Sequence, residues 1–374
     1  MSDTIYRNTW VEVDLEAIEY NLQQIKKRIS NKTKIIAVVK ADGYGHGSVQ
    51  VAKRAIKAGA SALAVALFEE ALTLRKAEIT VPILVLGWVP AKAAPIAAVN
   101  NITLTFFQKE WLQEVSTYQL EDKLHVHMKW DTGMGRIGVR TKSELKELLY
   151  ALNENPSIYL TGVFTHFATA DEADMSYFYE QKSRFEEMLK TFTEVWGKPV
   201  DVHIGNSASA IRLPEEMYDY IRFGIAMYGL YPSGTVKSER DVELKQAFSL
   251  HSRLAHVKKI AAGETVSYGA TYKAEKDEWI GTIPIGYGDG WIRKLQGVDV
   301  LVNGKRMPIV GRICMDQTMI RLDGEYPIDT KVTLIGKQNS AEIEMDEIAA
   351  HAETINYEIP CIINQRVPRL YKNE

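Results

Sequence analysis

Eight short apolar runs, rich in β-branched residues, alternate with longer amphipathic stretches between residue 34 and about residue 225. This alternation is typical of βα units built around a parallel sheet. The expected strands are residues 34–40, 61–67, 83–87, 102–107, 124–130, 159–166, 201–205 and 220–224. Eight parallel strands with crossover helices in about 190 residues predict a (β/α)8 barrel of small size. An open doubly wound sheet is the alternative.

The pattern changes after residue 240. From residue 248 onward apolar and polar residues alternate in twos, and Asn303 followed by Gly304 is a strong signal for a hairpin turn. We therefore expect residues 1–240 to form a barrel that binds the cofactor inferred below, and residues 241–374 to form a mainly antiparallel β domain. Residues 10–15 show the same alternation, and the sequence does not decide with which domain they pair.

Charge and cysteine content narrow the class of partner. The chain has 45 lysines and arginines against 48 aspartates and glutamates, a formal net charge of −3, without a long run of either sign. We therefore expect neither nucleic acid nor an anionic membrane surface as a partner. Cys314 and Cys361 are the only cysteines, and their spacing predicts no zinc or other metal site and a reduced, cytoplasmic setting.

The ends and apolar windows of the chain predict no targeting or membrane segment. The first ten residues lack the charged head and apolar core of a signal peptide. The most apolar long window, residues 81–99, contains three prolines and a lysine. It predicts a strand, a turn and a helix rather than a membrane span.

Seven polar side chains and one glycine lie at or just past the carboxyl ends of several predicted strands, where barrel enzymes place their active sites. They are Lys40, Lys129, Arg136, His166, Asn206, Ser207, Arg222 and Gly224. Residues 205–209 bring a hydroxyl to a helix start, and residues 222–226 bring a glycine, so together they predict a phosphate site. A convergence of this kind is hard to explain by packing alone.

A lysine at such a rim is either a solvated charge or an amine used for Schiff-base chemistry. The predicted phosphate site favours the second interpretation for Lys40, because an aldehyde cofactor that carries a phosphate is pyridoxal 5'-phosphate. The glycines at positions 43, 45 and 47 would allow a tight turn. That turn would bring Tyr44 near the same phosphate.

The chain resembles bacterial alanine racemases of the barrel type along its whole length. The motifs that carry the resemblance are AVVKADGYGHG around Lys40, KWDTGMGRIGV (129–139), VFTHFATAD (163–171), GNSAS (205–209), IRFGIAMYGLYP (221–232), ETVSYGATY (264–272), IGYGDG (285–290) and GRICMDQ (311–317). The resemblance implies a pyridoxal-phosphate-dependent isomerase that interconverts L- and D-alanine in the cytoplasm. It also implies a homodimer with shared active sites. Whether the D-alanine serves as a peptidoglycan precursor or is broken down is left open.

The resemblance also assigns roles to residues. It implies that Lys40 holds the cofactor and is one catalytic base, while Tyr268 of the partner subunit is the other. The remaining cofactor-binding residues that it implies are Tyr44, His166, Ser207, Arg222, Gly224, Ile225 and Tyr357. Arg136 and the backbone N–H of Met315, the latter from the partner, would bind the substrate carboxylate. Lys129 matches a lysine that can be carbamylated in the family.

Other functions fit the sequence less well. A barrel decarboxylase with the same cofactor would carry an acidic partner for the ring nitrogen and a run of glycines, where this chain has Arg222 and GNSAS. A cofactor carrier would resemble the barrel alone. His125, His127 and Lys129, which alternate along one predicted strand, could suggest a metal-dependent hydrolase. Serine stays open as a substrate, because exclusion by size is a weak filter.

Overall fold

The computed structural model describes residues 6–239 and 241–373. The chain divides into two compact units. The barrel unit consists of Ala17–Gly43 and Ser48–Lys245. The β unit consists of the segment that ends at Glu16, the short segment Tyr44–Gly47, and the segment that begins at Gln246. Each unit therefore combines segments from different parts of the sequence, and no single boundary residue separates the two units.

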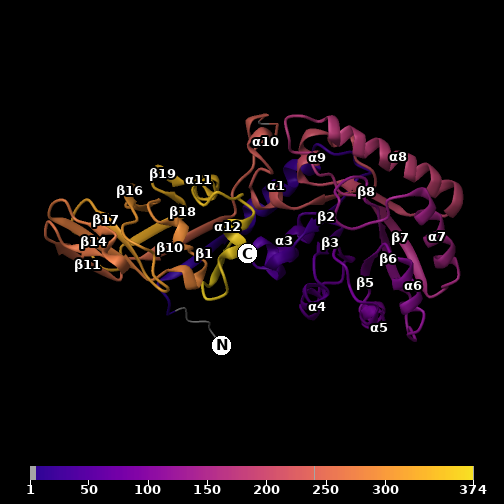
Figure 1. Ribbon diagram of the computed structural model, residues 1–374, viewed down its shortest axis with the longest axis horizontal. Helices are drawn as coiled ribbons and strands as arrows, with labels where there is room; N and C mark the ends of the chain where they lie inside the picture. Colours follow the sequence, from indigo (N-terminus) through magenta and orange to yellow (C-terminus); the bar gives the residue numbers. More distant parts are fainter. Residues whose placement is uncertain (1–5, 240, 374) are drawn as a thin grey trace. The chain divides into compact units, whose positions relative to one another are not determined.

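The barrel unit contains a closed barrel of eight strands (Figure 1). They are β2 (Lys34–Val38), β3 (Ala62–Val65), β4 (Ile83–Val85), β5 (Ile102–Phe106), β6 (Leu124–Lys129), β7 (Ile158–Phe164), β8 (Asp201–Gly205) and β9 (Tyr220–Phe223). Each pairs in parallel with the next, and β9 pairs with β2 to close the barrel. The predicted (β/α)8 barrel is confirmed, and the open sheet is excluded.

The strands are nearly all buried, as expected where both faces of a parallel sheet are covered. Several end earlier than the apolar runs suggested. β2 stops at Val38 and β7 at Phe164, so Lys40 and His166 lie two residues past their strands. Both residues therefore belong to the loops that follow the strands, which is where a barrel carries its chemistry.

Helices surround these strands (Figure 1). They are α1 (Leu15–Lys26), whose first two residues belong to the β unit, α3 (Ser48–Lys57), α4 (Phe68–Lys76), α5 (Ala94–Val99), α6 (Lys109–Val115), α7 (Lys142–Asn153), α8 (Ser176–Trp196), α9 (Ser207–Arg212) and α10 (Gly234–Glu239), with short 3₁₀ turns η1 (Ala91–Ala93), η2 (Pro214–Glu216) and η3 (Ile225–Tyr228). The Thr141 hydroxyl caps α7 by accepting from the N–H of Glu144. The buried indole of Trp130 packs on Phe185 of α8, with ring centres 5.0 Å apart, which anchors the longest helix to the barrel.

The β unit is mainly antiparallel. Its largest sheet has seven strands: β1 (Thr9–Asp14), β10 (Phe248–Arg253), β15 (Asp299–Val302), β16 (Lys305–Pro308), β18 (Lys331–Gln338), β19 (Ala341–Ile343) and β20 (Arg369–Lys372). A three-stranded sheet and a two-stranded ribbon follow, made of β11 (His256–Ile260), β14 (Glu278–Ile283) and β17 (Thr318–Leu322), and of β12 (Thr265–Val266) and β13 (Tyr272–Lys273). The unit also contains two short helices, α11 (Met345–His351) and α12 (Glu358–Ile362), and the 3₁₀ turns η4 (Tyr268–Ala270), η5 (Tyr287–Asp289) and η6 (Arg293–Leu295).

Two details of the β unit answer questions that the sequence raised. β1, whose domain was open, runs antiparallel to β10 and parallel to β20. Asn303 and Gly304 have φ of 51° and 79° and join β15 to β16. This is the two-residue hairpin turn that the dipeptide predicts.

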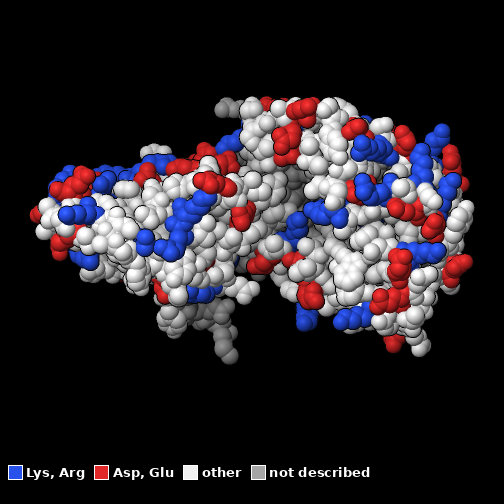
Figure 2. Space-filling model, viewed as in Figure 1, with Lys and Arg blue, Asp and Glu red and all other residues white. Residues whose placement is uncertain are grey.

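None of the described helices has the length and apolar character that crossing a membrane requires. On the face seen in Figure 2, basic and acidic side chains are interspersed over both units. This distribution agrees with the nearly balanced charge of the chain.

Candidate active site

Lys40 lies just past β2 and begins α2 (Lys40–Tyr44), which is not an ordinary helix. The three residues that follow Lys40 have φ of 52°, 51° and 62°, all in the left-handed region. That region costs an L-residue other than glycine about 1–2 kcal/mol, so the turn must be held by other contacts. The N–H of Gly43 donates to the carbonyl of Val39 at 2.9 Å, and Oδ1 of Asp42 accepts from the N–H of Ser48 at 2.8 Å. The expected tight turn after Lys40 is present.

Arg222, in β9, places its guanidinium inside the barrel, where the residue is 4% exposed. It donates to the carbonyl oxygens of Thr165 at 2.7 Å, His203 at 3.0 Å and Ile204 at 3.1 Å. It also contacts Nδ1 of His203 at 2.8 Å and Nδ1 of His166 at 3.2 Å. Backbone carbonyls and imidazoles from β8 and from the loop after β7 therefore fix one buried cation.

These contacts determine where the imidazoles carry their protons. A guanidinium can only donate, so Nδ1 of His203 and Nδ1 of His166 must accept, which leaves the proton of each neutral ring on Nε2. Nε2 of His203 lies 2.9 Å from Nδ1 of His127, which accepts in turn. The result is a hydrogen-bonded line that runs from His127 through His203 and Arg222 to His166.

Burial keeps this line of histidines neutral. It lowers the pKa of His127 to about 3, and the charges of His125 and Arg222 act in the same direction. The pKa values of His203 and His166 are also well below the ordinary value, first through burial and then through Arg222. Burial lowers the pKa of Arg222 itself to about 9, with a smaller contribution from Arg136. The guanidinium therefore stays charged at neutral pH.

Lys129 ends β6 with its side chain inside the barrel, 3% exposed. Its Nζ lies 4.8 Å from the centre of the Phe164 ring and has no hydrogen-bond partner among the residues the structure describes. Burial, followed by the charges of Arg222 and Arg136, places the pKa of Lys129 well below its usual range, and Asp131 opposes this only in part. Burial and the charges of two guanidinium groups therefore favour the neutral amine form of Lys129.

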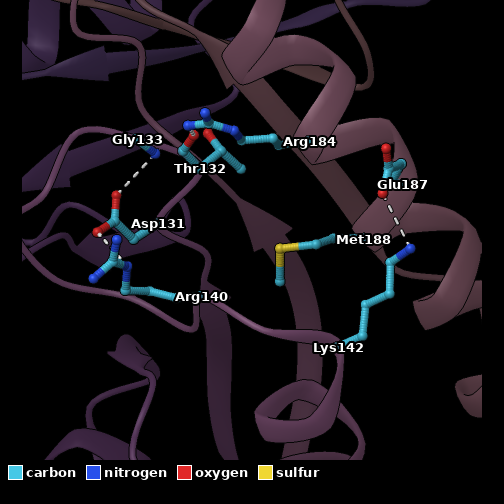
Figure 3. Close-up of a pocket in the computed structure, with 8 residues that line it drawn as sticks. All are labelled: Asp131, Thr132, Gly133, Arg140, Lys142, Arg184, Glu187 and Met188. Atoms are coloured by element: carbon cyan, nitrogen blue, oxygen red, sulfur yellow. Dashed lines mark hydrogen bonds and ion pairs between the residues drawn. The ribbon is translucent and has the colours of Figure 1, made fainter.

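The loop after β6 carries Arg136, whose residue is exposed. Oδ1 of Asp131 accepts from two backbone N–H groups of this loop, at 2.9 and 3.1 Å, and the longer bond, to Gly133, is drawn in Figure 3. Arg184 of α8 donates to the carbonyl of Thr132 at 3.2 Å. Figure 3 also shows a pocket of about 340 Å³, which is lined by Asp131, Thr132, Gly133, Arg140, Lys142, Arg184, Glu187 and Met188. A buried carboxylate and a helix thus shape the loop that bears Arg136.

The loops after β8 and β9 meet at Ser207. This residue begins α9, which Asn206 caps by accepting from the N–H of Ser209 at 3.0 Å. The Ser207 hydroxyl accepts from the N–H of Gly224 at 2.9 Å and from that of Ala226 at 3.4 Å. Ile225, which lies between them, is buried and begins η3. A hydroxyl and the backbone of the loop after β9 therefore lie side by side at the rim.

The other sequence-predicted residues belong to the β unit. Tyr44 and Tyr357 lie together, with ring centres 6.3 Å apart. Tyr268 and Met315 are 71% and 53% exposed, although both have large apolar side chains. The structure therefore groups the predicted residues by unit, and Lys40, Lys129, Arg136, His166, Ser207, Arg222, Gly224 and Ile225 all belong to the barrel unit.

Tyr268 and Met315 lie on adjoining loops. The Ser267 hydroxyl donates to the carbonyl of Arg312 at 2.5 Å, which ties the loop before Tyr268 to the loop before Met315. A third loop joins them, because the N–H of Tyr287 donates to the carbonyl of Cys314 at 3.0 Å. Tyr287 is itself 41% exposed. Three exposed side chains are thus presented by one set of connected loops.

Sequence reasoning did not find the pairing of His127 with His203. A register irregularity separates Val126 from His127, and the ring of His125 lies 6.2 Å from that of Tyr159 instead. His125 and His127 therefore do not point to a common site, as the interpretation of a metal-dependent hydrolase requires. In the sequence, His203 stands out only as a polar residue inside the apolar run of β8. This position does not indicate which residue His203 contacts.

Comparisons with known proteins agree with this architecture. The family model for the alanine racemase N-terminal domain matches residues 13–232, and that for the C-terminal domain matches residues 247–371. Alanine racemase from Anoxybacillus flavithermus is 54% identical over 374 residues, which covers 99% of this chain and 96% of that protein. Alanine racemase from Geobacillus stearothermophilus is 53% identical over 367 residues, with 98% and 94% covered.

A solved structure shows the same likeness in three dimensions. The crystal structure of alanine racemase from Bacillus anthracis with bound L-Ala-P superposes with a TM-score of 0.97 at 49% sequence identity. The match covers 99% of this chain and 96% of that chain. The chain belongs to the alanine racemase family.

Proposed function

We propose that the protein interconverts L- and D-alanine with pyridoxal 5'-phosphate, in the cytoplasm, as a homodimer that shares its active sites. The family and its close relatives support the reaction. The single observation that carries the mechanism is the buried Arg222, held by two neutral histidines and three carbonyl oxygens. A decarboxylase of this type would need a carboxylate opposite the ring nitrogen, and a fixed guanidinium cannot replace it.

The residues at the barrel rim fit the cofactor. An amine can hold an aldehyde, a hydroxyl beside backbone N–H groups can hold a phosphate, and a guanidinium can face a ring nitrogen. Lys40 would hold the cofactor covalently, and the other proposed ligands are Tyr44, His166, Ser207, Arg222, Gly224, Ile225 and Tyr357. When bound, the cofactor draws electron density from the substrate Cα and so acidifies its C–H bond.

Racemisation then needs a proton donor and a proton acceptor on opposite faces of Cα. We assign Nζ of Lys40 to one face and the phenol oxygen of Tyr268 of the partner subunit to the other. The proton of His166 is on Nε2, because Arg222 occupies Nδ1. That Nε2–H would donate to the tyrosine oxygen and favour its role as a base. The hydrogen-bonded line thus ends at the Nε2–H of His166, a donor whose position is fixed by the contact of Arg222 with Nδ1.

A dimer is required because the second base, Tyr268, is assigned to the partner subunit. Tyr268 is 71% exposed, and the loops around it also present Met315 and Tyr287 to solvent. Burying such a cluster against a second copy of the chain would remove apolar surface from water. It would also bring the Met315 backbone N–H to the substrate carboxylate, opposite Arg136.

Lys129 would support Arg136 as a carbamate. Its neutral Nζ can attack carbon dioxide, forming an N–C bond and releasing one proton, and the product is an anion. The guanidinium groups of Arg222 and Arg136, which disfavour the ammonium form, favour that anion. The same two charges, which add to the effect of burial on the pKa of Lys129, therefore also favour the expected modification. The choice of substrate depends on other residues. Tyr287 and Tyr357 would narrow the entrance to the active site and favour a substrate with a methyl side chain, so we expect serine to react more slowly than alanine.

One experiment tests the proposal. The purified, cofactor-loaded protein is incubated with individual L-amino acids in deuterated water, and both the enantiomer and the deuterium at Cα are measured. We expect inversion of alanine with deuterium incorporated at Cα. Exchange without inversion would refute racemisation, and inversion of serine without that of alanine would change the substrate.

A further inference from the structure

Lys40 is fixed on its two sides by different kinds of contact. On the strand side, the N–H of Val39 continues the barrel ladder by donating to the carbonyl of Ala64 at 2.9 Å. The buried hydroxyl of Tyr228 donates to the carbonyl of Val38 at 2.9 Å. On the other side the backbone enters the left-handed turn, where no strand ladder can hold it. Besides the bonds of Gly43 and Asp42 described above, the contact that holds the first residue of that turn therefore bears on the orientation of Lys40.

The first residue of the turn, Ala41, is held by a carboxylate. Its N–H donates to Oε1 of Glu70 at 2.6 Å. Glu70 is the third residue of α4, and its other oxygen, Oε2, accepts from the N–H groups of Ala66 at 2.8 Å and Leu67 at 3.0 Å. One carboxylate thus joins the loop after β2 to the loop after β3. Hydrogen bonds to an ionised acceptor of this length are among the strong ones.

We propose that Glu70 is a positioning residue, which holds the left-handed turn at Ala41 and thereby aims the amine of Lys40. This inference rests on the proposed function of Lys40. Ala41 has φ of 52°, a conformation that L-residues other than glycine avoid and that persists only where the surroundings impose it. Without its acceptor, Ala41 would relax toward ordinary φ, and the Cα–Cβ direction of Lys40 would change with it.

Glu144 offers a matched control. It is likewise the third residue of its helix, α7, and its Oε2 accepts from the N–H groups of Arg140 at 2.8 Å and Thr141 at 3.1 Å. Both of these bonds stay at the start of its own helix. Glu144→Gln therefore removes the same charge from the same position of its helix as Glu70→Gln does, while leaving the turn after Lys40 intact.

The test compares Glu70→Gln with Glu144→Gln in the cofactor-loaded protein. A glutamine has one carbonyl oxygen, and its amide NH₂ would face a backbone N–H, so at least one of the bonds of Glu70 is lost. We expect Glu70→Gln to lower kcat for alanine about tenfold with KM unchanged, and hydroxylamine to release the cofactor about tenfold faster. We also expect the pH at which the visible band of the bound cofactor titrates to shift. Glu144→Gln should match wild type in all three, although both variants lower the melting temperature.

The outcomes separate the two proposals. If Glu70→Gln and Glu144→Gln differ only in melting temperature, or not at all, Glu70 merely caps α4. If Glu70→Gln does not fold, Glu70→Asp serves instead, because it keeps the charge near the start of α4 while its shorter side chain draws the carboxylate away from Ala41. Cofactor release does not need alanine, so it tests Glu70 even if wild type fails to racemise, a failure that would refute only the proposed function. Wild-type protein that takes up no cofactor would refute both.

Discussion

Arg222 donates to Nδ1 of His203 at 2.8 Å, and this contact sets the tautomer of His203 and, through it, that of His127. His203 must carry its proton on Nε2, where it meets Nδ1 of His127 at 2.9 Å. A third histidine in the same barrel, His166, has its Nδ1 occupied by the same guanidinium. A protonated imidazole would place two donors against each other at either contact. Neutral histidines are therefore a structural requirement as well as a result of burial.

Stability should fall as the pH drops because of these histidines. The pKa of His127 is about 3 in the folded chain, whereas an unfolded histidine has a value of about 6.5. Between these values the unfolded state binds one more proton, so stability is complete above about pH 6.5 and is lost as the pH falls toward 3. One such group contributes a slope of roughly 1.4 kcal/mol per pH unit within this window.

The variant His127→Asn removes that proton but keeps an oxygen that can accept from His203. We expect its free energy of unfolding, measured by urea titration between pH 6.5 and 4.5, to fall less steeply than that of wild type. The difference should approach the slope of one proton. His256→Asn, at an exposed position, is the control and should follow wild type. Equal slopes for His127→Asn and wild type would contradict the neutral state of His127.

Ser207→Ala should weaken binding of pyridoxal phosphate about 10- to 100-fold, because a hydrogen bond to a charged group contributes roughly 1.5–3 kcal/mol. The measurement is equilibrium dialysis of the cofactor against the Lys40→Ala background, where the covalent link cannot mask the loss. Ser209→Ala is the control. Ser209 is equally buried in α9, but its hydroxyl bonds Asn206. Equal affinities for the two variants would place the phosphate elsewhere.

Features that depend on residues close together in the sequence were predicted, whereas contacts between distant segments were not. All eight barrel strands and the hairpin at Asn303 were predicted, because hydrophobic period and turn chemistry are local. The positions of Lys40 and Ser207 past the ends of β2 and β8 followed from the barrel topology alone. The partner of β1 and the bond between His127 and His203 were not found, because each joins segments that are far apart in the chain. The bridge from Glu70 to Ala41 was missed because no local pattern distinguishes it from a cap.

Lys129 should carry a carbamate. Its Nζ is buried, its pKa is well below the usual range because of burial and then the charges of Arg222 and Arg136, and those two charges favour an anion. Protein equilibrated with ¹³C-bicarbonate should show one carbamate resonance that is absent from Lys129→Met. In buffer freed of carbon dioxide we expect KM for alanine to rise about tenfold, because Arg136 loses its anionic support. Wild-type protein without the resonance, and with KM unaffected by carbon dioxide, would show that Lys129 acts as a free amine.

The shared active site predicts complementation between two inactive variants. Lys40→Ala lacks one base, and Tyr268→Phe lacks the other, so each alone should have almost no racemase activity. If Tyr268 serves the partner's barrel, a mixed dimer contains one site with both defects and one intact site. Unfolding and refolding an equal mixture should make half of the dimers mixed and restore roughly a quarter of wild-type activity. The control mixture is Lys40→Ala with His166→Ala, two residues of one barrel unit, and it should restore none. Failure of both mixtures would mean that Tyr268 acts within its own chain or not at all.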